Sequence, residues 1–133
     1  MKKNLEIIRA TYEGNAAENA KNLMASLAND VVWTEAAGFP YAGTYHGPQS
    51  IFDHVFHRLA TEWIDYRAKV HTYLADGDTV AAFGIYSGTY RATEVAMQAT
   101  FAHLYRLDAG KIVSMEQVVD SATVLRAMVP AAM

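Results

Sequence analysis

Residues 101–119 read Phe-Ala-His-Leu-Tyr-Arg-Leu (101–107), Asp-Ala-Gly (108–110) and Lys-Ile-Val-Ser-Met-Glu-Gln-Val-Val (111–119). The two long runs are rich in β-branched and aromatic residues, which is typical of strands. The residues between them form a short turn, because Gly110 adopts positive φ angles without the steric cost of a Cβ atom. The stretch therefore predicts a β-hairpin. We place this hairpin in the middle of a curved sheet that walls a ligand pocket.

Similar β-rich runs precede this hairpin, and together they predict four consecutive strands. The expected strands cover residues 66–75, 79–90, 95–107 and 111–119. Strands of ten or more residues are long for a small sheet, so they should twist and bend strongly. Gly84 and Gly88 lie inside one of these strands and are the expected points of bending.

The first half of the chain has helical periodicity around one short strand. Helices are expected over residues 4–13, from Asn15 to about residue 28, from Pro48 to Trp63, and over residues 122–128. Asn15 and Glu18 have the spacing of a capping box. Residues 31–35 form the short strand, in which Trp33 and Glu35 share one face, and residues 36–47 form a glycine-rich loop.

This order predicts a single α+β domain over residues 1–133. Helices grouped before a run of hairpins pack on one face of an antiparallel sheet. A strongly curved sheet closed by helices has the shape of a cone, and its open end forms a deep apolar pocket.

Composition narrows the class of protein. The chain has 52% hydrophobic and 19% charged residues, which is typical of a globular domain, and it has no apolar run long enough to span a membrane. The formal net charge of -3, without a Lys/Arg cluster, argues against nucleic-acid binding. The absence of cysteine, and an N-terminus without an apolar segment after its lysines, favour a cytoplasmic protein. No metal or cofactor is predicted, since His54 and His57 lack further matched ligands.

The order of elements, the Gly-Pro start of the third helix and the run Ala-His-Leu-Tyr-Arg-Leu-Asp-Ala-Gly-Lys-Ile-Val (102–113) resemble the NTF2-like superfamily. Within it the chain is most similar to SnoaL-like and ketosteroid-isomerase-like proteins. The resemblance covers nearly the whole chain and implies a cone-shaped cystatin/NTF2-like fold. It implies less about function, because this fold carries isomerases, cyclases, epoxide hydrolases and binding domains.

The catalytic residues of these relatives match the chain only in part. Glu35 precedes Gly38 by the spacing of the proton-shuttling carboxylate of ketosteroid isomerases, and Tyr12 lies near their oxyanion-hole tyrosine. Their oxyanion-hole aspartate falls on Ala102. His103 matches the histidine of SnoaL-type cyclases, whose catalytic aspartate falls on Gln117.

Epoxide hydrolases of this superfamily differ more. They also place an acid at the position of Gln117, and their Arg-x-Asp pair falls on Gly84 and Tyr86. An epoxide hydrolase is therefore not expected.

Glu35, His103 and Tyr86 are the candidate catalytic residues. A carboxylate beside Trp33 in an apolar cone would have a raised pKa and suit a general base, whereas the alternative is an acid in solvent or in a salt bridge. His103 would transfer protons or orient a carbonyl, or be a buried structural histidine. Tyr86 would donate to an oxyanion.

Seven further residues are expected to line the pocket: Tyr12, Trp33, Tyr45, Phe56, Ala102, Gln117 and Val119. Ala102 and His103 face opposite sides of their strand, and the two family alignments disagree on which side lines the pocket.

Two alternative functions are predicted from these residues and from the resemblance. The first is a cofactor-independent isomerase or cyclase acting by proton transfer on an apolar carbonyl compound. The second is a non-catalytic ligand-binding or dimerisation module of the same fold. A homodimer is expected, because the convex face of the sheet would otherwise expose apolar strands.

Overall fold

The computed structural model describes residues 3–130, so the first two and last three residues of the predicted domain 1–133 lie outside it. Its strands are β1 (Leu27–Glu35), β2 (Gly43–His46), β3 (Trp63–Asp76), β4 (Thr79–Tyr90), β5 (Val95–Asp108) and β6 (Lys111–Val119). Its α-helices are α1 (Asn4–Arg9), α2 (Ala16–Ser26), α3 (Pro48–Ile51), α4 (His57–Glu62) and α5 (Ser121–Ala127). A π-helical turn, Phe52–Phe56, joins α3 to α4.

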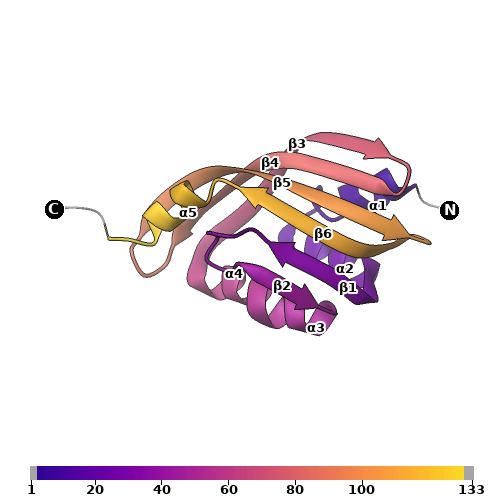
Figure 1. Cartoon of the computed structure of the whole chain (residues 1–133). Coiled ribbons are helices and arrows are strands. Elements are labelled where there is room, and N and C mark those ends of the chain that lie inside the picture. Colours follow the sequence, from indigo (N-terminus) through magenta and orange to yellow (C-terminus); the bar gives the residue numbers. More distant parts are fainter. Residues whose placement is uncertain (1–2, 131–133) are drawn as a thin grey trace.

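The strands form one curved sheet in the order β2-β1-β6-β5-β4-β3 (Figure 1). The hairpin β5–β6 lies at its centre, as predicted, and Leu107 and Asp108 pair with Ile112 and Lys111 on the two sides of the turn. The predicted sheet was antiparallel throughout, but β1 pairs with β6 in parallel. In sequence, β2, the helical segment α3–α4 and the strands β3, β4 and β5 lie between these two strands.

The sheet bends where the sequence places its two strand glycines. The pairing of β3 with β4 shifts between Ile64 and Arg67 and again between Val70 and Thr72, and Gly84 pairs with Val70 beside the second shift. A Cβ atom on Gly84 would lie 2.2 Å from the backbone oxygen of Lys69. Only glycine therefore allows β3 to approach so closely at this point.

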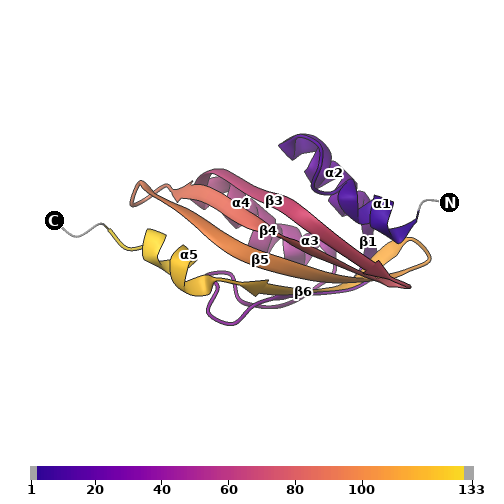
Figure 2. The same cartoon turned by 90° about the horizontal axis from the view of Figure 1, so that it is seen from above.

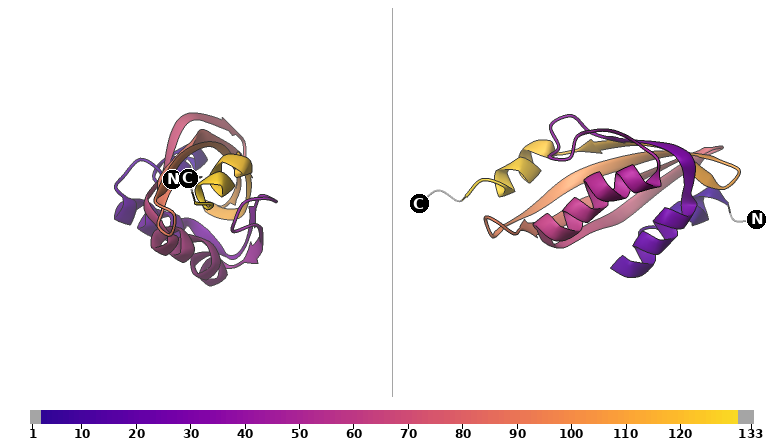
Figure 3. Two further views of the ribbon diagram at one scale, coloured as in Figure 1. Left: turned by 90° about the vertical axis from the view of Figure 1, so that its left-hand side faces the viewer. Right: turned by 90° about the horizontal axis from the view of Figure 1, so that it is seen from below.

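The helices lie on the concave side and at the ends of the sheet. The segment α3–α4 runs across one face of the sheet, while α1–α2 and α5 lie at opposite ends (Figures 2 and 3). The predicted capping box is confirmed, because Asn15 accepts from the Glu18 N–H and Glu18 accepts from the Asn15 N–H. Asp120 caps α5. None of the helices within residues 3–130 has the length and apolar character to cross a membrane.

The core consists of two clusters of buried side chains. The first cluster contains Trp33, Tyr105 and Met115. The second cluster contains Trp63, Tyr86 and Phe101, together with residues of α5. Every second residue of β5 is buried, so this alternating face is the concave one: Met97, Ala99, Phe101, His103, Tyr105 and Leu107.

Several boundaries differ from the sequence prediction. Helix α1 ends at Arg9 rather than residue 13, and β3 begins at Trp63 rather than residue 66. The first strand begins at residue 27 rather than 31, because its early residues pair with the start of β6. The predicted loop 36–47 contains β2, whose four residues pair with the end of β1. A strand this short gives no periodic signal inside a glycine-rich stretch.

Candidate functional site

Glu35 lies at the end of β1, inside the molecule. Its side chain is only 5% exposed and shares the inner face with Trp33, as predicted. The Trp33 indole N–H donates to Glu35 Oε1 at 3.2 Å, whereas Glu35 Oε2 is buried without a hydrogen-bond partner. Burial raises the pKa of the Glu35 carboxyl to about 7, and the Trp33 hydrogen bond lowers it only in part. Such a group accepts or releases a proton near neutral pH.

His103 lies on β5 between two tyrosine hydroxyls. Its Nε2 shares a hydrogen bond with Tyr86 Oη at 2.5 Å, and its Nδ1 shares one with Tyr12 Oη at 2.5 Å. The Tyr12 hydroxyl in turn shares a hydrogen bond with that of Tyr105 at 2.5 Å. Gln117 on β6 extends the series, because its Nε2 donates to Tyr86 Oη at 2.8 Å. We call Gln117, Tyr86, His103, Tyr12 and Tyr105 the polar chain.

The polar chain holds His103 in its neutral form. The residue is 8% exposed, and burial lowers the pKa of its imidazole to about 3. Burial also raises the pKa of Tyr86 well above its usual value. Because both ring nitrogens of His103 already have partners, the imidazole reaches a ligand only through the tyrosines. The direct catalytic role that the sequence suggested for His103 stays a prediction.

Aromatic rings surround the inner polar groups. The rings of Tyr86 and Phe101 stack with centroids 4.1 Å apart, and Tyr66 lies 5.3 Å from Tyr86. The Tyr66 hydroxyl is buried and, like Glu35 Oε2, has no partner. The negative charge of Glu35 contributes to the raised pKa values of both Tyr66 and Tyr86, after burial itself. Two unsatisfied polar groups within this aromatic interior are the sort of feature that marks a binding site.

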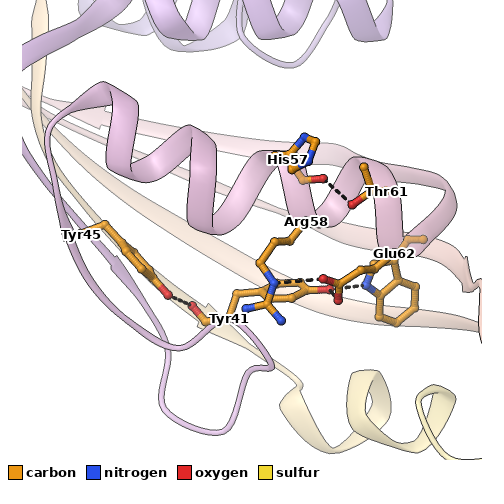
Figure 4. A network of polar contacts seen from close by, with 7 residues as sticks. Tyr41, Tyr45, His57, Arg58, Thr61 and Glu62 are labelled. Atoms are coloured by element: carbon orange, nitrogen blue, oxygen red, sulfur yellow. Dashed lines mark hydrogen bonds and ion pairs between the residues drawn. The ribbon is translucent and has the colours of Figure 1, made fainter.

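A second polar network fixes the loop after β1 to the helix α4 (Figure 4). Tyr41 donates to Glu62 Oε1 at 2.8 Å and accepts from the Trp63 indole N–H at 3.0 Å. Arg58 pairs with Glu62 at 3.0 Å and covers the Tyr41 ring at 4.5 Å from its centroid. Tyr45 donates to the backbone oxygen of Tyr41 at 2.8 Å. These contacts hold the loop that follows Glu35 in one position.

Most of the predicted pocket residues lie on the inner face. Trp33, Tyr12 and Gln117 contact the candidate catalytic residues directly, and the Phe56 ring packs edge-on against Trp33 at 5.5 Å. Val119 is partly buried on the inner face and packs on the second cluster.

Two of the predicted pocket residues point elsewhere. Tyr45 packs on the first cluster but directs its hydroxyl to loop carbonyls. Ala102 lies on the opposite face of β5 from His103, paired with Phe83 and Val118, both of which are exposed. Strand alternation thus places Ala102 on the outer face of the sheet.

Sequence reasoning missed Tyr66 and Tyr41. The strand β3 changes register twice, so alternation along it gave no consistent inner face. Tyr41 lies in a loop, where no periodic pattern exists.

Two hollows lie away from Glu35. One, of about 480 Å³, lies against β3, β4 and β5 and is lined by residues that include Arg67 and Gln98. The other, of about 600 Å³, lies between the N-terminal helices and the turns near Asp78 and Gly110. Neither is lined by Glu35 or His103, so the apolar chamber over Glu35 stays a prediction that rests on the buried, unpartnered groups.

Comparison with known proteins supports the fold and the family. The family model for the SnoaL-like domain matches residues 8–115. An NTF2-like protein from Burkholderia thailandensis is 42% identical, with a TM-score of 0.92 over 98% of this chain and 100% of its own. None of the curated proteins compared matches the chain.

Two more distant structures share the fold alone. TerC, crystallised with polyporic acid, is 23% identical with a TM-score of 0.81, covering 94% of this chain and 97% of its own. IdmH, a putative polyketide cyclase from Streptomyces antibioticus, is 20% identical with a TM-score of 0.75, covering 96% and 99%. With the family match over most of its length and the curved sheet described above, this chain belongs to the SnoaL-like family of the NTF2-like superfamily.

Proposed function

We propose that this single SnoaL-like domain binds a small apolar compound with a carbonyl group and moves a proton next to that carbonyl. Family membership and the fold neighbours support a small-molecule-binding domain. The observation that carries the finer proposal is Glu35, a buried carboxyl with one unpartnered oxygen and a pKa raised by burial to about 7.

The proposed roles follow from the contacts. Glu35 would take the proton from the carbon beside the carbonyl, since a carboxylate with a pKa near the working pH is an effective base. Tyr86 would donate to the carbonyl oxygen as negative charge develops there. His103 and Gln117 would position the Tyr86 hydroxyl, which contacts both. The reaction would be an isomerisation or a cyclisation and would use the side chains of this chain alone.

The alternative is a domain that binds such a compound without changing it. The residue that favours it is Gln117, which stands where the resemblance expects an acid and cannot move a proton at neutral pH. Both polar atoms of its amide are hydrogen-bonded: Nε2 donates to Tyr86 Oη, and Oε1 accepts from the Ala36 N–H at 3.0 Å.

Retained ligand distinguishes the two functions. The protein would be purified without denaturation, its bound compound identified by mass spectrometry, and the same compound incubated with fresh protein. We expect an apolar carbonyl compound whose isomer or cyclised product accumulates. Recovery of unchanged compound after long incubation would support the binding module, and a retained compound without a carbonyl would contradict the proposed substrate class.

A homodimer through the outer face of the sheet is also proposed. Phe83, Ile85, Leu104 and Val118 are between 36% and 68% exposed there, and Phe83 and Val118 flank Ala102 in one cross-strand row. Such an apolar patch is usually covered in solution. Light scattering at micromolar concentration should give twice the 14.7 kDa chain mass.

The variant Val118→Glu should dissociate this dimer, because it places a charge on the most exposed of the four apolar side chains of the proposed interface. Ala17→Glu, at an exposed position of α2, serves as the control with the same added charge. A monomer mass for the unmodified protein, or an intact dimer in Val118→Glu, would contradict the proposed interface.

A further inference from the structure

The orientation of the Gln117 side-chain amide in the polar chain is fixed by a backbone group outside the polar chain. Gln117 Oε1 accepts from the backbone N–H of Ala36 at 3.0 Å, and a backbone N–H can only donate. The amide nitrogen of Gln117 must therefore face Tyr86, to which it donates at 2.8 Å. Tyr86 Oη thus always accepts one hydrogen bond, and its own proton remains to be placed.

His103 is the next group in the polar chain and has a single proton to share. A neutral imidazole carries one N–H donor and one acceptor nitrogen, and both nitrogens of His103 face tyrosine hydroxyls at 2.5 Å. Within residues 3–130 its hydrogen-bond partners are these two hydroxyls, not a carboxylate or an ammonium group. The position of this one proton therefore decides the direction of both hydrogen bonds that His103 makes.

The His103 proton has two positions. In the first, Tyr86 donates to Nε2 and Nδ1–H donates to Tyr12, so the Tyr86 proton is engaged, and the hydrogen bond between Tyr12 and Tyr105 can run in either direction. In the second, Nε2–H donates to Tyr86, whose proton is left free, Tyr12 donates to Nδ1, and Tyr105 donates to Tyr12. Both states are neutral. Passing from the first to the second moves a proton from Tyr86 to Nε2, from Nδ1 to Tyr12 and from Tyr12 to Tyr105, so Tyr86 must take up one proton, and Tyr105 must release one, in exchange with a ligand or water.

Tyr86 and Tyr105, near the two ends of the polar chain, lie in different parts of the interior. Tyr86 belongs to the second cluster and Tyr105 to the first. Both ends also experience the field of Glu35, which contributes to the raised pKa of each tyrosine. The tautomer of His103 thus decides whether the Tyr86 hydroxyl is free to donate.

We propose that the polar chain is a reversible two-state relay in which the tautomer of His103 is set by the hydrogen-bond demand at the Tyr86 and Tyr12 hydroxyls. A carbonyl oxygen at Tyr86 selects the state with Nε2–H, because only that state leaves the Tyr86 proton free to donate. An enol or alcohol O–H offered to Tyr86 selects the opposite state. The use of the relay in catalysis rests on the proposed function, whereas the reversal itself does not.

The tautomer can be measured directly at pH 7 by NMR of the protein with ¹⁵N-labelled histidine, using His103→Gln to assign the signals. Tyr86→Phe removes the group facing Nε2, so the proton should move to Nδ1, where Tyr12 can accept it. Tyr12→Phe removes the group facing Nδ1, so the proton should stay on Nε2, where Tyr86 can accept it. The two variants are thus expected to hold opposite tautomers.

Tyr73→Phe is the matched control. Its ring packs against Tyr12 at 6.3 Å, but its hydroxyl makes no hydrogen bond to a member of the polar chain, so this variant should keep the tautomer of the unmodified protein. The same tautomer in Tyr86→Phe and Tyr12→Phe, or a doubly protonated His103, would overturn the relay. Because the measurement needs no ligand or turnover, a failed relay is distinguishable from a failure of Glu35 as base.

Discussion

Replacing Glu35 with Gln should lower the rate of isomerisation of a Δ5-ketosteroid by about 10²- to 10⁴-fold, the usual contribution of a general base. The amide keeps the size of the carboxyl and can still accept from the Trp33 indole N–H, but it cannot take a proton. The rate for the unmodified protein should rise with pH as the carboxyl deprotonates, with a midpoint near its pKa of about 7.

The control for this experiment is Glu116→Gln. Glu116 is an exposed carboxylate on β6, so its replacement removes the same charge without altering the interior. Steady-state kinetics with the ketosteroid, and with smaller ketones that can form enols, should show a normal rate for this control. Equal rates in Glu35→Gln and the unmodified protein would remove Glu35 as the base.

The second large effect is on the pH dependence of stability, where Glu35 and His103 act in opposite directions. The folded pKa of Glu35 is raised from 4.5 to about 7, so its contribution to stability is present below pH 4.5 and is lost as pH rises through 7. The folded pKa of His103 is lowered from 6.5 to about 3, so its contribution is present above pH 6.5 and is lost as pH falls through 3.

Single variants should separate the two contributions. Between pH 7 and pH 4 each group changes the free energy of unfolding by about 3 kcal/mol, and in the unmodified protein the two changes nearly cancel. Relative to that protein, His103→Gln should become more stable on acidification and Glu35→Gln less stable. Urea unfolding at the two pH values measures this, and parallel pH profiles for all three proteins would show that neither group is buried as described.

The sequence predicted the elements that have strong periodic or local signals. Alternation along residues 101–119 predicted the central hairpin, and the Asn15–Glu18 spacing predicted the capping box. The side-by-side placement of Trp33 and Glu35 followed from strand geometry alone, because β1 is regular there. These predictions needed no knowledge of distant contacts.

The inner polar contacts could not be predicted in the same way. Tyr12 and His103 are 91 residues apart, and their hydrogen bond depends on how α1 docks on the sheet. The two family alignments left the inner face of β5 undecided, and only the pairing of the strands placed His103 inside and Ala102 outside. Tyr66 was missed because the register shifts in β3 interrupt the alternation that would have identified it.

One titration probes the environment of Glu35 directly. In protein labelled with ¹³C at the glutamate carboxyls, the signal that disappears in Glu35→Gln should titrate with a midpoint near 7. A midpoint near the ordinary glutamate value of about 4.3 would place this carboxyl in water and contradict the proposed base.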